Sequence, residues 1–132
     1  MDPELRALVE AAYAAMSSGD AEQMIPLCDP EVSFQSRITA VEEVTYRGYD
    51  GVRRFFGRLG DVFEWYEVAP LEIDGKGDRV VALAHFRARG RGSGAVAEQR
   101  FFHAIRLRDR RAVWWAFFDS MDEARAAVGL GR

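Results

Sequence analysis

Two long apolar runs near the end of the chain, joined by a charged link, constrain the fold more than any other feature. They are residues 99–107 and 112–119, and the link is 108–111. Apolar runs on either side of a short polar link predict neighbouring strands of an antiparallel hairpin. The chain should therefore contain a sheet whose last two strands supply much of the apolar interior.

Each run carries one titratable side chain on an otherwise apolar face. With the two-residue period of a strand, His103 shares its face with Phe101, while Asp119 shares its face with Trp115 and Phe117. A titratable group on an apolar wall costs free energy unless it is paired or used. His103 and Asp119 are therefore the first candidates for chemistry.

The remaining periodicities predict helices that are segregated from a meandering sheet. We expect a helix from Pro3 to 17–19, a short one from Asp20 to Leu27, one capped by Asp50, and a last one capped at Ser120. The expected strands are 31–38, 44–47, 63–73, 79–89 and the two final runs, with a turn at Asp29-Pro30. This order predicts an α+β fold in which a strongly curved antiparallel sheet wraps around the N-terminal helices as a cone-shaped α+β barrel.

Composition favours an ordinary globular protein. The 132 residues are 48% hydrophobic and 30% charged, which suits a single domain spanning 1–132. No apolar run approaches the roughly 20 residues that span a bilayer, and the acidic start is unlike a signal peptide. We therefore expect a cytoplasmic protein with no membrane association.

Charge is distributed unevenly along the chain. The net charge is −3, yet residues 76–118 are rich in arginine. A basic surface for nucleic acid is one interpretation, but many of these arginines alternate with apolar residues, as on the solvated face of a sheet. The alternation favours the solvated face, so we expect no nucleic-acid partner.

Neither a metal nor a cofactor is expected. Cys28 is the only cysteine, and His85 and His103 have no clustered carboxylates around them. The glycine-rich link at 90–94 lacks the lysine and following helix of a phosphate-binding loop. It is predicted to be a hairpin turn.

Three segments spread over the chain resemble the nuclear-transport-factor-2-like superfamily, and its SnoaL-like domains in particular. They are Gly-Asp at 19–20 with Asp-Pro-Glu-Val-Ser-Phe at 29–34, the aromatic and glycine-rich stretch 46–56, and Phe-Asp-Ser-Met-Asp-Glu-Ala at 118–124. The resemblance implies a cone-shaped α+β scaffold with a cavity for a small molecule. Function varies widely on such scaffolds.

The resemblance also tests residue positions. Ketosteroid isomerases of this superfamily use a tyrosine, an aspartate base and a protonated aspartic acid; the matching positions here are Ala12 (one residue before Tyr13), Ser36 and His103. None matches, which argues against ordinary ketosteroid isomerisation. The SnoaL-like cyclases, with a histidine and an aspartate on the last strands, resemble the pair His103 and Asp119.

Both residues have a structural alternative. His103 is either a proton donor and acceptor near neutral pH or a core histidine whose ring nitrogens are satisfied by neighbours. Asp119 is either a base or an N-cap of the last helix, a role that Ser120 could equally take. Arg37, Glu42 and Glu43 lie near a loop that could cover the pocket, although surface exposure suits them better.

Aromatic side chains are expected to line the pocket, although most aromatics of a small domain belong to its core. The candidates for substrate binding are Tyr13, Phe34, Trp65, Phe101, Trp115 and Phe117. The opposite face of the sheet, with Arg100, Phe102, Ala104 and Arg106, is the expected homodimer surface.

These features lead to two hypotheses. In the first, the chain binds a small apolar organic ligand and performs cofactor-independent acid–base chemistry as an isomerase or cyclase: Asp119 removes a proton next to a carbonyl and His103 stabilises the enolate. In the second, the same scaffold is a non-catalytic ligand-binding or dimerisation module.

Overall fold

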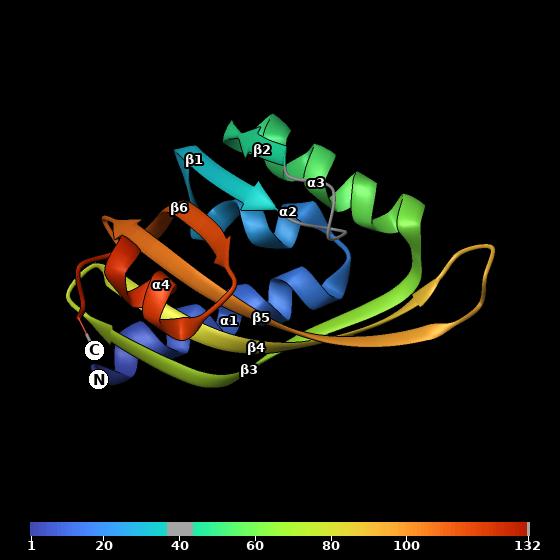
Figure 1. Ribbon diagram of the computed structural model, residues 1–132. Helices are drawn as coiled ribbons and strands as arrows, with labels where there is room; N and C mark the ends of the chain where they lie inside the picture. The colour runs from blue at the N-terminus through green and yellow to red at the C-terminus, as the bar shows by residue number, and fades with distance from the viewer. Residues whose placement is uncertain (37–43, 132) are drawn as a thin grey trace.

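A computed structural model describes residues 1–36 and 44–131 of the chain. Its helices are α1 (Pro3–Ser18), α2 (Ala21–Met24) with the 3₁₀ turn η1 (Ile25–Leu27), α3 (Gly48–Val62) and α4 (Met121–Ala127). Its strands are β1 (Cys28–Ser36), β2 (Val44–Arg47), β3 (Phe63–Lys76), β4 (Arg79–Gly90), β5 (Val96–Arg108) and β6 (Arg111–Phe118). Helices and one sheet are segregated (Figure 1), which confirms the α+β class.

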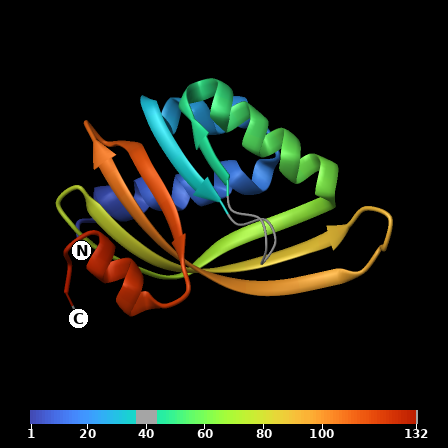
Figure 2. The ribbon, with the colours of Figure 1, turned by 45° about the horizontal axis from the view of Figure 1, so that its top comes forward.

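The sheet differs from the expected antiparallel pattern at one pairing. Its order is β2-β1-β6-β5-β4-β3, and it is open, with β2 and β3 at its two edges. Strands β3 to β6 form the predicted antiparallel meander, but β1 and β6 are parallel. The reason lies in the connection: α3 carries the chain from β2 to the far edge (Figure 2), and four alternating strands return it beside β1 in the same direction.

Local signals place most element ends correctly. Asp2 caps α1, its Oδ1 accepting from the Glu4 N–H at 3.0 Å, and Gly19 ends that helix at a φ of 74°. Ser120 caps α4 by accepting from the Glu123 N–H at 3.2 Å. Helix α3 begins at Gly48, so that Asp50 lies in its first turn and is not the predicted cap.

The predicted turn at Asp29-Pro30 is wrong, because both residues lie within β1. Asp29 accepts the Glu31 N–H at 2.8 Å, and Arg108 from the end of β5 donates to both of its carboxylate oxygens, at 2.8 and 3.1 Å. These contacts lie where the pairing of β1 with β6 shifts register, between Cys28 and Ser33. The last two residues of the predicted strand 31–38 lie outside the described residues.

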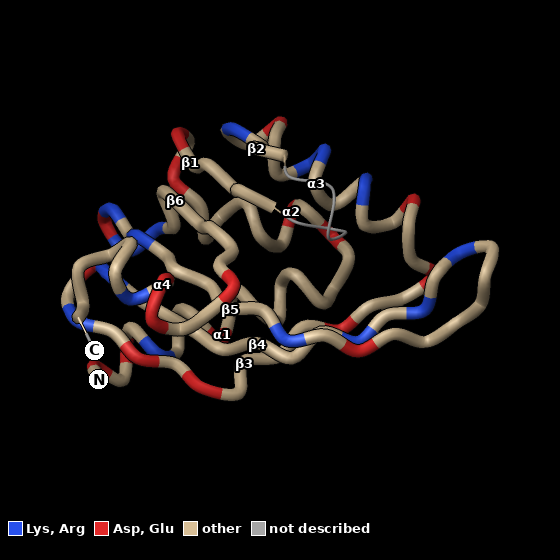
Figure 3. The backbone as a smooth tube through the Cα atoms, viewed as in Figure 1, with Lys and Arg blue, Asp and Glu red and all other residues tan. Residues whose placement is uncertain are grey.

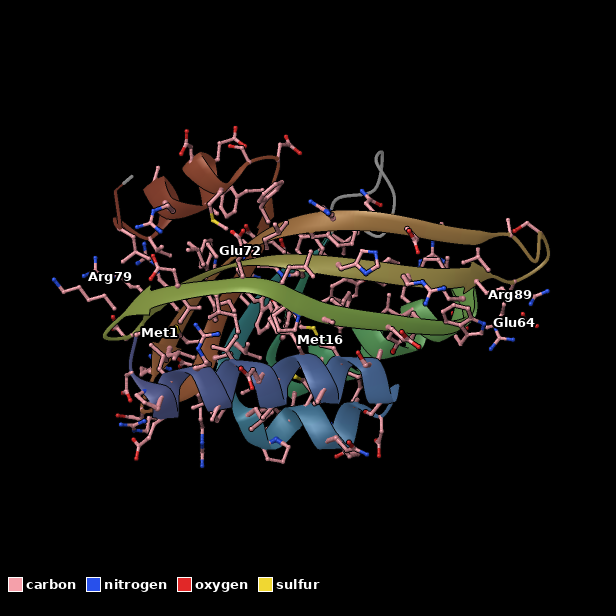
Figure 4. The ribbon with its side chains drawn as sticks, turned by 90° about the horizontal axis from the view of Figure 1, so that it is seen from below. Met1, Met16, Glu64, Glu72, Arg79 and Arg89 are labelled. Carbon is pink, nitrogen blue, oxygen red and sulfur yellow. The ribbon has the colours of Figure 1, made fainter. Side chains whose placement is uncertain are left out.

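The sheet separates two apolar layers. Helices α1 and α3 pack on one face, where Met16 lies between α1 and the sheet, and α4 packs on the other (Figure 4). Under α4, Ala104 is completely buried, and Arg106 donates to the Ala127 carbonyl at 2.9 Å. Two of the four residues of the expected homodimer surface therefore lie against the chain's own last helix: Ala104 is buried and Phe102 packs on the same cluster, while Arg106 stays exposed.

Two arginines of the outer face have acidic partners nearby. Arg87 lies 3.0 Å from a Glu98 carboxylate oxygen, and Arg89 lies 3.1 Å from one of Glu64. Figure 3 shows basic and acidic residues side by side along these strands. This mixture supports a solvated sheet face and argues against a continuous basic surface in this region.

Two glycines of α3 give a test of how closely this helix approaches the sheet. A Cβ at Gly51 would lie 2.8 Å from the Tyr46 carbonyl carbon, whereas one at Gly57 would meet nothing within 4 Å. We expect Gly51→Ala to lower the free energy of unfolding by about 1 kcal/mol or more through overpacking. Gly57→Ala should raise it by up to about 1 kcal/mol through helix propensity. Urea unfolding of both variants measures this, and equal signs would contradict the close approach.

Candidate functional site

A small cavity lies between α1, α3 and the inner face of the sheet. Its volume is about 40 Å³, room for about three water molecules at roughly 10–15 Å³ each on this measure. The wall is mostly apolar and includes the rings of Phe55, Phe63, Phe86, Phe101 and Phe117. The polar lining residues among those described are Ser36, Tyr66 and His103.

His103 is the most buried of these polar residues. It lies on β5, with Ala82 of β4 on one side and Phe117 of β6 on the other, and is 1% exposed. Burial lowers the pKa of its imidazole to about 3. The ring is therefore neutral at physiological pH, with one nitrogen that donates and one that accepts.

A hydrogen bond from α1 assigns those two nitrogens. The Tyr13 hydroxyl lies 2.7 Å from His103 Nδ1, and burial raises the pKa of this phenol, which stays protonated. Among the described residues, Nδ1 is the only hydrogen-bond partner of that hydroxyl. We assign Tyr13 as the donor and Nδ1 as the acceptor, because the opposite tautomer would leave both the hydroxyl proton and the Nε2 lone pair without a partner in these residues. The proton of the neutral ring then resides on Nε2, which is buried without a partner in the described part of the chain.

Aromatic rings hold the imidazole in place. Phe117 lies edge-on at 4.4 Å between centroids, Trp115 at 5.6 Å, and Phe101 is stacked at 6.0 Å. These contacts leave His103 little freedom to turn. The arrangement fixes a neutral imidazole in the wall of an apolar cavity, with an Nε2–H that has no partner in the described part of the chain.

Asp119 is placed elsewhere. It is exposed, follows the last residue of β6, and lines a depression on the outer surface with Gln35 and Glu123. Its backbone N–H donates to Glu123 Oε2 at 3.1 Å, next to the start of α4. It is absent from the residues that line the His103 cavity.

The match of a family model decides the family. The model for the SnoaL-like domain covers residues 9–126. The chain belongs to the SnoaL-like domain family. A search of the curated proteins found no relative of this SnoaL-like domain.

Solved structures share the fold of this SnoaL-like domain. A nuclear-transport-factor-2-like protein of unknown function from Burkholderia pseudomallei superposes with a TM-score of 0.78 at 22% identity, over 96% of this chain and 98% of that one. TerC, co-crystallised with polyporic acid, gives 0.75 at 22%, over 94% and 96%. A protein with the ketosteroid isomerase-like fold from Catenulispora acidiphila, in complex with trimethylamine, gives 0.78 at 18%, over 98% and 95%.

The structure brings only some of the predicted binding residues of the SnoaL-like domain to the cavity. Phe101 and Phe117 line it. Tyr13 is not a lining residue, but it forms a hydrogen bond with His103, which is one. Phe34 and Trp115 are buried in the core behind the wall. The alternation of residues on a strand predicts which side chains face inward, but not how far along the strand the cavity lies.

Trp65 faces the opposite side of the sheet. It is 38% exposed, and the Arg87 guanidinium lies 5.9 Å from its ring centroid. The register of β3 against β4 shifts between Phe63 and Trp65, which moves Trp65 outward and leaves Phe63 and Tyr66 facing the cavity.

Sequence reasoning missed Tyr66 and Phe86 as lining residues of the SnoaL-like domain. In β3, the two-residue spacing of Tyr66 and Val68 could have shown that they share a face. The register shift before them concealed that this face is the inner one. Arg37, Glu42 and Glu43, which we expected near a loop over the pocket, lie outside the described residues.

Two further observations on the described residues concern metals and membranes. In residues 1–36 and 44–131 no group of three or more histidine, cysteine, aspartate or glutamate side chains is arranged to hold a metal ion. None of the helices in the same residues is long and apolar enough to span a bilayer.

Proposed function

We propose that this SnoaL-like domain binds a small, uncharged, mostly apolar organic molecule in the His103 cavity. The observation that carries the proposal is the buried Nε2–H of His103, a donor without a protein partner among the described residues, in an otherwise apolar wall. Pockets of this kind, apolar with few placed polar groups, are typical of small-molecule sites. A carbonyl oxygen of the ligand is a suitable acceptor for this donor.

The cavity disfavours charged ligands, because the charge of the ligand would be buried there without a partner. None of the described residues that line the cavity is an aspartate, glutamate, lysine or arginine, and an unpaired charge in such surroundings is costly. TerC, a structure with the same fold, was crystallised with polyporic acid. That complex supports a small organic molecule as the type of ligand.

Cofactor-independent acid–base chemistry is the second candidate. A neutral histidine that donates to a carbonyl polarises it and stabilises an enolate, which favours an isomerase or cyclase acting on an apolar carbonyl compound. Such a reaction also needs a base, and Asp119 keeps this role only if it reaches the ligand from its position outside the cavity. The binding function therefore leads.

The homodimer also stays a proposal. Beyond α4, the outer face still exposes Arg100, Trp65 and Val96, the last two being 38% and 51% exposed. An aromatic ring and an arginine on one face suit contact with a second copy.

Filling the cavity tests the binding proposal. Leu59 of α3 lines the cavity, whereas Leu71 is 51% exposed. We expect Leu59→Phe to weaken binding of cyclohexanone about tenfold or more, because the larger ring occupies the ligand's space, while Leu71→Phe binds like the parent protein. NMR titration measures both affinities, and native mass spectrometry of the purified parent protein looks for a retained natural ligand.

Equal affinity of the parent protein and Leu59→Phe would contradict the proposal, since binding would then occur elsewhere. A thermal scan at saturating cyclohexanone gives an independent check. A ligand at 100 times its dissociation constant stabilises the folded state by about 2.7 kcal/mol, and Leu59→Phe should lose that gain.

A further inference from the structure

We propose that the Tyr66 hydroxyl is a second polar contact of the cavity, so that the natural ligand is an uncharged molecule about one ring in size with two oxygen atoms. One oxygen accepts from His103, and the other pairs with Tyr66. This inference rests on the proposed binding function and adds the chemical class of the ligand.

The Tyr66 hydroxyl is buried and has no hydrogen-bond partner among the described residues, and Tyr66 lines the same cavity as His103. A buried hydroxyl without a partner is costly, so a native structure that keeps one calls for an explanation. Two of the cavity's residues share this property, one on β3 and one on β5. A ligand that pairs with both explains both at once.

Among the described residues, the end of α1 offers the Tyr66 hydroxyl no hydrogen-bond partner. Ser17, on the last turn of α1, already donates to the Val68 carbonyl at 3.0 Å and accepts the Val68 N–H at 2.9 Å. Gly19 brings no side chain, and even an added Cβ there would stay 3.8 Å from the hydroxyl oxygen. The end of α1 therefore does not supply a hydrogen-bond partner for the hydroxyl.

A series of aromatic contacts links the ring of Tyr66 to that of His103. Tyr66 stacks on Phe86 at 6.4 Å, Phe86 contacts Phe101 at 5.6 Å, and Phe101 stacks on His103 at 6.0 Å between ring centroids. These rings suit a ligand with an apolar middle and a polar atom at each end. The volume of about 40 Å³, near three water molecules, limits the apolar middle to no more than one ring.

The two contacts differ in their hydrogen-bonding roles. Because Tyr13 occupies Nδ1, His103 only donates, which requires an acceptor oxygen at that end, and a carbonyl oxygen meets this requirement. The Tyr66 hydroxyl donates or accepts, so the other end carries either a hydroxyl or a second carbonyl.

A matched pair of ligands tests the proposal on the intact chain. One probe is a cyclohexanone with a hydroxyl across the ring from the carbonyl, and the other carries a methyl group in place of that hydroxyl. The parent protein should bind the hydroxyl probe about five- to tenfold more tightly, the value of one hydrogen bond. In Tyr66→Phe this preference should be lost or reversed, because the hydroxyl of the probe then has no partner; NMR titration measures both affinities.

Tyr49→Phe is the control, since the Tyr49 hydroxyl donates to the Cys28 carbonyl at 3.1 Å and Tyr49 does not line the cavity. It should keep the preference for the hydroxyl probe. Tyr66→Phe loses a hydroxyl that has no protein partner in the described residues, so its melting temperature should be unchanged or higher.

Three results would overturn the inference. If the parent protein binds both probes equally, Tyr66 is not a contact, although the binding function stands. If Tyr66→Phe keeps the preference, the second contact lies elsewhere. If neither probe binds the parent protein, and Leu59→Phe likewise binds neither probe, both the inference and the proposed function fail.

Discussion

Trp115→Ala is expected to lower the free energy of unfolding by about 3–5 kcal/mol, the range for removing a large aromatic side chain from a core. The side chain is 1% exposed and has Tyr13, Phe34 and His103 around it, with ring centroids at 5.3, 5.7 and 5.6 Å. Its removal leaves a space that these rings fill only in part. Urea unfolding followed by circular dichroism gives the difference.

Trp65→Ala is the matched control, because Trp65 was predicted from the same reasoning to share the pocket. Its ring is 38% exposed and contacts the Arg87 side chain. Its loss should cost about 1 kcal/mol or less. Similar losses for the two variants would show that Trp115 is not the core residue described here.

Acidification is expected to destabilise the protein through His103. Its pKa is about 3 in the folded chain, against 6.5 for the ordinary side chain, so between these pH values the unfolded state binds one more proton. Above pH 6.5 the imidazole is neutral in both states, and its titration does not lower the free energy of unfolding. As the pH falls from 6.5 toward 3, the free energy of unfolding decreases by about 1.4 kcal/mol per pH unit. The total reaches a few kcal/mol.

His103→Gln tests this contribution, because glutamine does not titrate and its side-chain oxygen still accepts from Tyr13. The slope of unfolding free energy against pH should be about 1.4 kcal/mol per unit smaller in the variant, over the upper part of this window. Hydrogen bonds from Arg108 and Arg125 hold the pKa of Asp29 and Asp74 below the usual range, which adds acid sensitivity at lower pH in both proteins. Parallel slopes in the two proteins would mean that His103 is not buried as a neutral ring.

Much of the scaffold could be predicted because short periodic patterns report local geometry. The stripe of Val52, Phe55, Phe56 and Leu59 identifies the buried side of α3, and each of these side chains is buried. Strand β2 has the predicted bounds, Val44–Arg47. The parallel pairing of β1 with β6 was beyond reach, because no local pattern reports which distant strand lies alongside.

The site was predictable only where the alternation of a strand continues without interruption. His103 lies in the regular middle of β5 and faces inward as expected. The same rule fails for Asp119, since β6 ends one residue earlier, and for Trp65, where the register shifts. A two-residue period has no meaning past a strand end or a bulge.

The parallel pairing of β1 with β6 joins Phe34 to Trp115, from opposite ends of the chain. Contacts between such distant positions close large loops and form slowly during folding. Ser36 of β1 and Phe117 of β6 both line the cavity, so the pocket cannot exist until the final strand has been synthesised and docked. If the domain binds a small molecule as proposed, ligand occupancy should consequently report completion of the entire fold, and a shortened chain lacking β6 should not bind it.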